Sequence, residues 1–556
     1  MKKPKIEILS NVRARIVRAP KTVLKYLDDA LAETQKGSEW APNHRRFGGR
    51  WDGKRHHFHI SPTFAGIGTF PKGLLSRVQA LLAKQSVKAK VRDLRKHILP
   101  AVPLSGVHAD MLEGVSMDGR YSFQLDAVKS ALKAQSGIIF IATNGGKTSI
   151  AAAMIKALDQ HTILFVVPKA ILLKQAREDI ASRLGTIVEN IGVIGGGRFE
   201  PKEITIAIIN SITPSKKSPS ARAKNRNAVL REYLKTIDVV FLDEGHHAKA
   251  TTWFRLMGAL PNAQFRYLMS GTPFTGDNDL MVEAATGPVI CEIRNDELIK
   301  LGVSAKPYVR MIAINKPDLA QADDQSWDGV YKAGIIYNVY RNKVIARIAD
   351  EYAADGKAVL VLVRQLNQGS AIRQLIKYPV EFAHGKMPDS ERDRLVDWFK
   401  ITKKGRVLIA SSILDEGVDV PAVNALIVAD GGQSLRAVLQ KIGRSIRRKR
   451  KGPNIVAAVD FADATHKWLA KHSLERIDIY TGESFDIAEE EVDEKEISAR
   501  NGKKAVHALP RQINGRSELS RSRADADGGF GVSIQIDSQM LQTCREIMYW
   551  RWRQAS

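Results

Sequence analysis

Two short segments of the chain hold residues whose types and spacing could do chemistry. The first, IATNGGKTS at 141–149, places a Gly-Gly-Lys-Thr turn behind an apolar run. Such a turn directs backbone N–H groups and one ammonium at the phosphates of a nucleotide. The second, FLDEGHH at 241–247, ends another apolar run with an Asp-Glu pair, which suits a magnesium ion and a water. Together they predict a site that hydrolyses ATP.

Four of these residues receive roles from their chemistry. Lys147 can reach the β- and γ-phosphates and the Thr148 hydroxyl can ligate Mg²⁺, although Ile141 stands where the general pattern has its first glycine. Asp243 would hold Mg²⁺ through water, and Glu244 would be the general base for the attacking water. A solvated acidic strand end is the alternative, which Lys147 disfavours. The other predicted nucleotide contacts in the loop are Asn144, Gly145, Gly146 and Ser149.

Apolar runs that alternate with amphipathic helices must position these residues. A first set of runs occupies 137–143, 162–168, 204–211, 237–244 and 266–273. A second set occupies 357–364, 380–385, 406–412 and 425–431. This alternation is typical of parallel sheets with crossover helices, whose ligands bind at the carboxyl ends of the strands. The sequence therefore predicts two α/β domains, with a helix at 149–158 behind the phosphate loop.

Length, charge and cysteine usage narrow the class of protein. A chain of 556 residues exceeds the roughly 250–300 residues of a single core, so we expect three or four domains. The net charge of +25 attracts polyanions such as nucleic acids, although a merely basic soluble protein is the alternative. Cys291 and Cys544 are too few for a disulfide framework. No apolar run reaches the ~20 residues of a membrane span, so we expect a cytoplasmic protein without membrane contact.

Most of the net positive charge lies in residues 1–100, where 22 Lys and Arg against 7 Asp and Glu give +15 of the total +25. This balance predicts a nucleic-acid-binding module, with a closing helix within 70–84. We interpret the alternation of histidines with apolar residues at 57–60 as a strand with one solvent-exposed face. The candidate contacts are Arg50, Trp51, Lys54 and Arg55. Core packing is favoured over base stacking for the aromatic residues Trp40, Phe47, Trp51 and Phe58. Phosphate or solvent contact is favoured over metal binding for His56, His57 and His59.

The order of motifs resembles the superfamily 2 helicases and translocases, which are built from two RecA-like domains. The corresponding segments are YSFQ (121–124), NGGKT (144–148), VVPKAILLKQ (166–175), IINS (208–211), DEGHH (243–247), SGTP (270–273), VLVR (361–364), SSILDEGVDVP (411–421) and QKIGRSIRR (440–448). The run Arg50 to Gly53 resembles part of the small N-terminal domain of the phage UvsW-type branch-migration helicases. The second histidine of DEGHH, His247, departs from the family pattern and has no assigned role.

The resemblance implies further roles. Gln124 would read the adenine edge, Gln440 would position the attacking water, and Arg444 and Arg447 would act as arginine fingers. On the ribose side the expected residues are Gly417 and Asp419. Nucleic-acid contact is expected at Lys169, Ser211, Arg364 and Ser411. Coupling of ATP state to domain movement is expected at His246, Ser270 and Thr272.

The predicted fold is therefore α/β: two tandem RecA-like domains, a small basic α+β N-terminal domain and a C-terminal extension. The expected bounds are 1–108, 109–300, 301–475 and 476–556. A basic insertion at 215–227 is expected to be an exposed loop that touches nucleic acid or is simply solvated. In the extension, Trp550 and Trp552 lie on an expected amphipathic helix and pack on the body or, less favoured, stack on bases.

The expected function is an ATP-dependent DNA helicase or translocase that acts on branched, forked or single-stranded DNA in phage recombination, repair or replication restart. It would then work in the cytoplasm of the host bacterium. An RNA helicase is one alternative. An ATP-switched sensor or annealing protein without processive unwinding is another, and an inactive architectural DNA binder is the weakest. The sequence leaves open the shape of the substrate, the polarity of movement, the oligomeric state and any protein partner.

Overall fold

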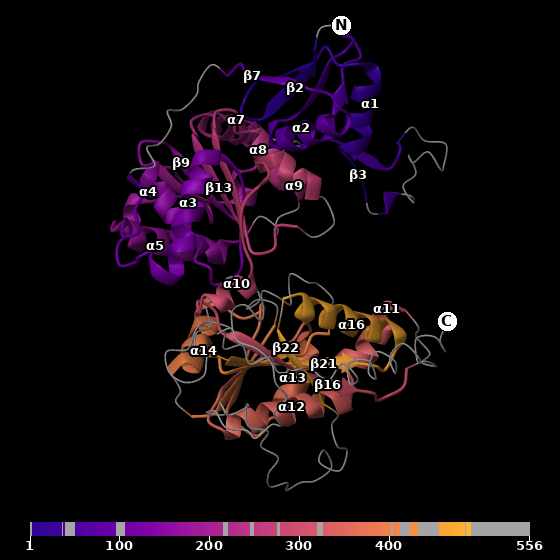
Figure 1. Cartoon of the computed structure of the whole chain (residues 1–556). Helices are drawn as coiled ribbons and strands as arrows, with labels where there is room; N and C mark the ends of the chain where they lie inside the picture. The colour runs from indigo at the N-terminus through magenta and orange to yellow at the C-terminus, as the bar shows by residue number, and fades with distance from the viewer. Residues whose placement is uncertain are drawn as a thin grey trace, which may run out of the picture. The chain divides into compact units, whose positions relative to one another are not determined.

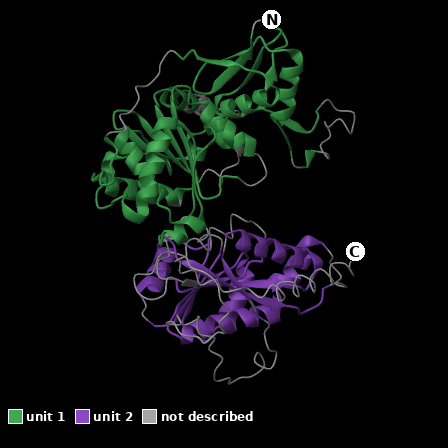
Figure 2. Cartoon of the chain, in the orientation of Figure 1, with its two compact units in different colours: residues 1–303 green, residues 304–556 purple. Residues whose placement is uncertain are grey.

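The computed structural model describes residues 3–35, 37–38, 51–95, 106–214, 221–244, 250–274, 279–319, 326–401, 404–411, 423–431, 455–483 and 485–490. The chain divides into two compact units, residues 1–303 and 304–556 (Figure 2). The first unit contains a small N-terminal domain and an α/β domain, and the second contains another α/β domain (Figure 1).

The N-terminal domain is a five-stranded sheet in the order β5-β6-β2-β1-β7, with α1 and α2 on one face. Alternation of residues along the strands explains this arrangement, because Ile6, Ala14 and Ile16 are fully buried while their neighbours are not. Its elements are β1 (Lys5–Ile8), β2 (Arg13–Val17), α1 (Lys21–Ala30), β3 (Ala32–Thr34), β4 (Lys54–His56), β5 (His59–Ile60), β6 (Gly68–Pro71), the 3₁₀ turn η3 (Lys72–Leu74), α2 (Leu75–Lys84) and β7 (Lys90–Asp93). The strands β3 and β4 form a separate hairpin.

The first α/β domain is an eight-stranded sheet in the order β11-β10-β12-β9-β13-β14-β8-β15, parallel except for the β10–β11 pair. Its strands are β8 (Ser136–Ile141), β9 (Ile163–Val167), β10 (Gly192–Gly195), β11 (Arg198–Glu200), β12 (Ile204–Ile208), β13 (Val239–Asp243), β14 (Phe265–Ser270) and β15 (Val289–Ile293). Its helices are α3 (Ser122–Ala134), α4 (Lys147–Ala157), α5 (Ala170–Leu184), α6 (Ile209–Ile212), α7 (Ala221–Lys235), α8 (Ala250–Gly258), α9 (Asp279–Thr286) and α10 (Asn295–Lys300). Two apolar clusters, one on each face, bury the central strands, which explains their continuous apolar sequences.

The second α/β domain is a parallel seven-stranded sheet in the order β18-β19-β17-β20-β21-β16-β22. Its strands are β16 (Lys306–Ile314), β17 (Ala358–Leu362), β18 (Val380–Ala383), β19 (Arg406–Ala410), β20 (Ala425–Val428), β21 (Ile455–Asp463) and β22 (Asp486–Glu490). Its helices are α11 (Trp327–Tyr331), α12 (Val339–Ala354), α13 (Leu366–Leu375), α14 (Asp389–Ile401) and α16 (Lys467–Gly482). Both sheets confirm the predicted pair of RecA-like domains.

Three local predictions are wrong. The predicted strand at 57–60 with one solvent-exposed face is shorter, since only β5 forms there. Its exposure also differs from the prediction: His57 is 3% exposed and Ile60 is 39% exposed, because a bend before β5 turns His57 inward. Residues 221–227 of the expected loop at 215–227 belong to helix α7. The boundary at 475 falls inside α16, and β22 adds to the second sheet beside β16, so the second domain continues to at least Glu490.

Candidate active site

A tight loop between β8 and α4 carries the predicted phosphate-binding residues. Asn144 and Gly146 adopt left-handed backbone conformations, with φ of 72° and 81°, and Gly146 caps the helix that begins at Lys147. Ile141, which replaces the usual first glycine, is fully buried and packs so closely under Gly145 that a Cβ there would overlap it. The departure from the general pattern therefore serves as core packing beneath the loop, while the start of α4 remains suited to phosphate because the N–H groups of a helix's first turn point toward its N-terminal end.

Strand β13 delivers the two acidic residues to the same edge of the sheet. The Lys147 Nζ lies 2.9 Å from Glu244 Oε1. Burial, together with repulsion from Glu244, raises the pKa of Asp243 to about 7, and Lys147 opposes that rise. In the sheet β14 lies between β13 and β8, so the Asp-Glu strand is not the direct neighbour of the loop strand.

The donors at this edge fit a magnesium ion. Two adjacent carboxylates that repel each other are hard oxygen ligands of the kind that Mg²⁺ prefers, and the Thr148 hydroxyl in the first turn of α4 is another. Within the described ranges there is no cluster of three or more His, Cys, Asp or Glu that would form an all-protein metal site. Thr148 and Asp243 would therefore hold Mg²⁺ jointly with nucleotide phosphates. The ion would neutralise phosphate charge and lower the pKa of Asp243.

Gln124 and Ser149 both lie near the loop, but their contacts differ. The Gln124 side chain is buried and donates from Nε2 to the Gly145 carbonyl over 2.9 Å, so it braces the phosphate loop. Its reading of adenine stays a prediction. The Ser149 hydroxyl accepts from Arg183 Nε of α5 over 3.2 Å and lies between two helices. Because the Ser149 hydroxyl is buried against α5, Ser149 is the least suited of the predicted loop contacts to touch the nucleotide.

The end of β14 lies against the base of the phosphate loop. Ser270 is fully buried, and its hydroxyl accepts the Thr272 backbone N–H over 3.1 Å. A Cβ on Gly271 would lie 3.3 Å from the Ile141 carbonyl oxygen, so a side chain there would require the neighbouring backbone to move by a few tenths of an ångström. Ser270 and Thr272 flank this close contact, and their coupling role stays a prediction.

The predicted nucleic-acid contacts of the motor differ in exposure. Lys169 is exposed at the start of α5, and Ser211 is half-buried in α6. In the second domain Arg364 is exposed, and its guanidinium lies 5.6 Å from the centre of the Tyr331 ring. Ser411 is only 4% exposed and its N–H donates to Ala383, so it is not accessible to a phosphate in this structure.

In the N-terminal domain, some of the residues predicted to contact nucleic acid make contacts within the protein instead. Trp51 is half-buried and its indole N–H donates to the Lys54 carbonyl over 2.8 Å, while Lys54 points to solvent. Arg55 contacts the Met281 sulfur over 3.4 Å. Phe58 is fully buried and stacks with Phe70, as the core interpretation predicts.

Two of the three histidines contradict the prediction of phosphate or solvent contact, whereas His59 is exposed to solvent as that prediction expects. His56 lies between Asp28 and Asp52, with ring nitrogens 2.8 and 2.9 Å from their carboxylates. His57 is buried and its Nε2 lies 2.9 Å from Glu33. Carboxylates that are distant in sequence come to these rings through the fold, which sequence spacing did not reveal. The remaining expectations fall outside the described residues and stay predictions: Arg50, His246, His247, Gly417, Asp419, Gln440, Arg444 and Arg447, with the aromatic residues Trp40, Phe47, Trp550 and Trp552.

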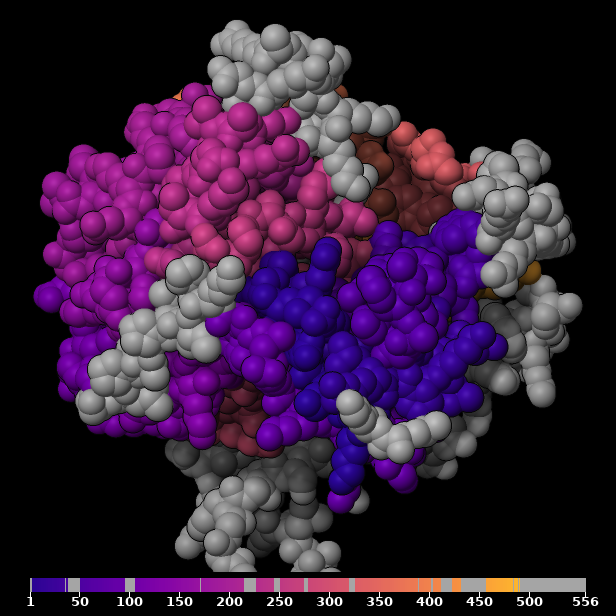
Figure 3. Space-filling view, turned by 90° about the horizontal axis from the view of Figure 1, so that it is seen from above, coloured from indigo at the N-terminus to yellow at the C-terminus, as the bar shows by residue number. Residues whose placement is uncertain are grey.

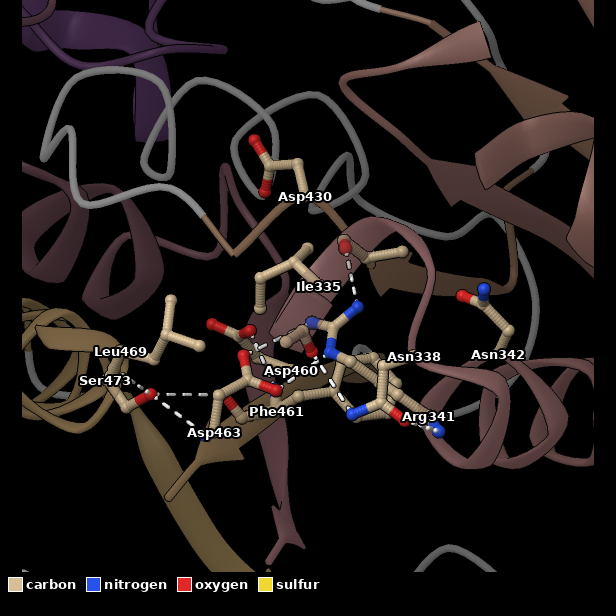
Figure 4. A network of polar contacts seen from close by, with 12 residues as sticks. Ile335, Asn338, Arg341, Asn342, Asp430, Asp460, Phe461, Asp463, Leu469 and Ser473 are labelled. Atoms are coloured by element: carbon tan, nitrogen blue, oxygen red, sulfur yellow. Dashed lines mark hydrogen bonds and ion pairs between the residues drawn. The ribbon is translucent and has the colours of Figure 1, made fainter. Parts of the chain in front are cut away.

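One buried polar cluster was not predicted. In the second domain Arg341 of α12 forms an ion pair with Asp463 of β21 over 2.7 Å and donates to the Ala429 carbonyl (Figure 4). Arg476 of α16 pairs in the same way with Asp460 over 2.8 Å. The only sequence signal for this cluster is the pair of aspartates inside the apolar run IVAAVDFAD (455–463).

Comparison with known proteins supports the two-domain motor. A model described as "Type III restriction enzyme, res subunit" matches residues 119–275, and one described as "Helicase conserved C-terminal domain" matches residues 342–449. The DNA 3'-5' translocase XPB2 of Sulfurisphaera tokodaii is 24% identical over 433 residues, which cover 70% of this chain and 93% of that protein. The ATP-dependent DNA helicase uvsW of Enterobacteria phage T4 is 24% identical over 390 residues, which cover 65% of this chain and 75% of that protein.

A solved structure agrees at the level of the fold. The Type ISP restriction-modification enzyme LlaBIII bound to DNA has a TM-score of 0.52 at 13% identity, covering 74% of this chain and 34% of that one. The described part of the present chain has no helix that is both long and apolar enough to cross a membrane. Both motor domains, in order and with the phosphate loop and acidic pair at one sheet edge, identify the chain as an ATP-dependent superfamily 2 helicase that resembles the UvsW group.

Proposed function

We propose that the chain is a DNA helicase or translocase that acts on branched or forked DNA, in phage recombination, repair or replication restart. The names of the two relatives, a DNA translocase and a phage DNA helicase, support DNA as the track. The observation that carries the proposal is the basic N-terminal domain packed on the first motor domain, because a second nucleic-acid surface beside a motor suits a substrate with more than one duplex arm.

The outer face of the N-terminal sheet is the surface we assign to DNA. The strand registers place side chains from β2, β1 and β7 on the face opposite the two helices. The basic residues there are Lys5, Arg13, Arg15, Lys90 and Arg92, against the single carboxylate of Glu7. Glu7 pairs with Arg15 over 2.7 Å. Phosphate contacts of this type position a duplex without reading its sequence.

In the motor, ATP would bind across the phosphate loop with Lys147 on its β- and γ-phosphates. Nucleotide would draw Lys147 away from Glu244, which frees that carboxylate to accept a proton from water. Arg444 and Arg447 would reach the γ-phosphate when the two domains close, with Gln440 beside the water and Gly417 and Asp419 beside the ribose. Reopening after hydrolysis would advance the protein along a strand. The name of the XPB2 relative supports the 3'-5' direction.

The ATPase rate tests the substrate class. We would measure it with no nucleic acid, with single-stranded DNA, with forked DNA, with a four-way junction and with RNA, using Lys147→Ala as the inactive control. We expect the strongest stimulation by forked or four-way DNA. Equal stimulation by a plain single strand would contradict the branched-substrate proposal, and stimulation by RNA alone would replace DNA with RNA as the track. Strand displacement on the same forks separates a motor from an ATP-switched annealing protein.

Paired charge variants test the N-terminal surface. Lys5→Gln with Lys90→Gln removes two charges from the outer sheet face, while Lys21→Gln with Lys25→Gln removes two from α1 on the other face. We expect the first pair to reduce the salt slope of junction binding by about 2, and the second pair to leave it unchanged. Equal slopes in both pairs would remove the sheet face from the proposal without affecting the motor.

A further inference from the structure

A cavity of about 390 Å³ lies where the N-terminal domain meets the first motor domain. Its volume is in the ~300–1,000 Å³ range of ligand pockets. Figure 3 shows the N-terminal residues in indigo directly beside the pink surface of the motor domain. The walls come from β2, β6 and η3 on one side and from α8, α9 and the starts of β8 and β14 on the other. This is the end of the motor sheet opposite the phosphate loop, so the cavity is separate from the ATP site.

The ionisable residues that line the cavity are all basic. They are Arg13, His59, Lys72 and Arg266, and no Asp or Glu belongs to the lining. Among the described residues no ion pair joins a carboxylate to Lys72 or Arg266, and Asp93 and Glu283 pair with Arg95 and Arg77 instead. Lys72 has only a long hydrogen bond of 3.4 Å to the Ser136 hydroxyl, and Arg266 donates to backbone carbonyls such as Met257.

Lys72 is the least compensated of these cations. Burial lowers its pKa to about 8, and repulsion from Arg95 and Arg266 adds to that fall. Asp93 is the carboxylate that attracts it, but Arg95 already holds Asp93 through hydrogen bonds of 2.9 Å. A desolvated ammonium among other cations is costly unless an anion joins them.

The cavity is held rigidly on both sides. Asn11 donates from its side chain to the Pro261 and Asn262 carbonyls over 3.2 and 3.1 Å. Gly73 lies so close to α9 that a Cβ on it would overlap the Glu283 and Ala284 backbone. These contacts fix the two walls of the cavity relative to each other, so a ligand would meet a preformed site.

We propose that this cavity binds a phosphate group, with Lys72 as its central contact and Arg13 at its mouth. Phosphate fits because its oxygens accept charge-assisted hydrogen bonds from ammonium and guanidinium groups. The bound anion would offset the repulsion among the cations and stabilise the docking of the N-terminal domain. This inference goes beyond the proposed function, and binding and melting measurements test it without ATP hydrolysis.

Isothermal titration with inorganic phosphate is the first test. All proteins would carry Lys147→Ala to weaken the ATP site, and NaCl would hold the ionic strength constant. We expect one bound phosphate, with affinity reduced at least about tenfold by Lys72→Gln and largely kept by Lys72→Arg. Lys84→Gln is the matched control, since Lys84 is exposed at the end of α2 in the same domain. Equal affinity in Lys72→Gln and Lys84→Gln would overturn the proposal.

Thermal melting supplies an independent sign. Without phosphate we expect Lys72→Gln to melt above the parent protein, because it removes a desolvated cation. With phosphate the order should reverse, since only the parent gains from binding. If Lys72→Gln melted below the parent protein both with and without phosphate, the proposed repulsion among the cations would be contradicted. Arg13→Gln, an exposed position that tolerates change, should also weaken phosphate binding and keeps the test valid if Lys72→Gln folds poorly.

Competition distinguishes the two sources of such a group. A short DNA duplex added before the titration would abolish phosphate binding if the cavity takes a phosphate of the DNA backbone. An unchanged phosphate affinity in saturating duplex would assign the cavity to a free phosphate or a small phosphate ester. If phosphate binding disappeared when chloride replaced another anion at the same ionic strength, the cavity would lack selectivity for phosphate. That result would overturn the proposal.

Discussion

The two motor domains each hold a cluster of opposite charges, and the clusters differ in burial and in completeness. In the second domain Arg341 and Asp463 are 0% and 2% exposed, and the neighbouring Arg476–Asp460 pair is 1% exposed on both sides. Tyr480 completes that pair by donating to Asp460 over 2.6 Å. In the first domain Lys147 and Glu244 are 13% and 21% exposed.

The difference separates charges that hold a fold from charges that act on a ligand. The cluster of the second domain ties α12, β21 and α16 together, and its guanidinium groups also bind backbone carbonyls (Figure 4). Burial raises the pKa of Asp463, and Arg341 opposes that rise, so the aspartate depends on its partner. The pair in the first domain is reachable by solvent and can exchange partners when a nucleotide enters.

The largest effect on stability should come from the buried cluster. Arg341→Met leaves Asp463 buried without its main partner, and we expect a loss of about 3–5 kcal/mol in the free energy of unfolding. Urea unfolding of the full chain measures this loss. The control is Arg347→Met on the same helix, whose pair with Glu351 is 29% and 37% exposed and should contribute about 0–1 kcal/mol. Equal losses in the two variants would remove the distinction between the clusters.

The open pair should show the reverse pattern, with a large effect on activity and a small one on stability. We expect Lys147→Ala to reduce the DNA-stimulated ATPase by ~10²–10³-fold, because an interaction with transferring phosphate is lost. The change in unfolding free energy should stay within about 1 kcal/mol. Lys156→Ala, an exposed lysine at the end of the same helix, should change neither quantity. A Lys147→Ala protein that unfolds easily would show that the pair is structural.

The two clusters also differ in how far the sequence revealed them. The phosphate loop and the acidic pair are local: strand, turn and helix follow one another within a few residues, so both were predicted with their roles. The Arg341–Asp463 pair joins positions 122 residues apart, and only the fold brings them together. The second domain also continues past its predicted end. Strand β22 has the sequence DIAEE, and its acidic residues do not show the apolar pattern from which a strand is predicted.

Docking of the N-terminal domain was invisible for the same reason. The Glu33 carboxylate accepts the Leu280 N–H over 2.6 Å at the start of α9, and it also pairs with His57. Neither spacing nor composition predicts a contact across 247 residues. Burial works against the charge of Glu33, but His57 and the α9 amides outweigh it and lower its pKa. This pair is intermediate in burial between the two motor clusters.

An intermediate effect is accordingly expected from Glu33→Gln. The variant keeps the shape of the side chain but loses the charge that binds His57 and the α9 amides, so we expect a loss of about 1–3 kcal/mol. Urea unfolding, with limited proteolysis between the N-terminal and first motor domains, measures the change. Asp29→Asn removes an exposed carboxylate from the neighbouring α1 and is the control. A loss no larger than that of the control would mean that apolar packing alone holds the domain.

The smallest effect should come from the most exposed pair, and it should depend on pH. Burial disfavours the charged His56 ring, yet hydrogen bonds to Asp52 and Asp28 outweigh burial and raise its pKa. A raised folded-state pKa adds stability below the ordinary histidine pKa and loses it as the pH rises through the folded value. His56→Gln should therefore cost about 0.5–1 kcal/mol at pH 5.5 and less at pH 8.5, whereas His108→Gln, an exposed histidine, should show no such dependence. Urea unfolding at both pH values measures the difference, and an equal cost at both would mean that His56 contributes through its shape and not its charge.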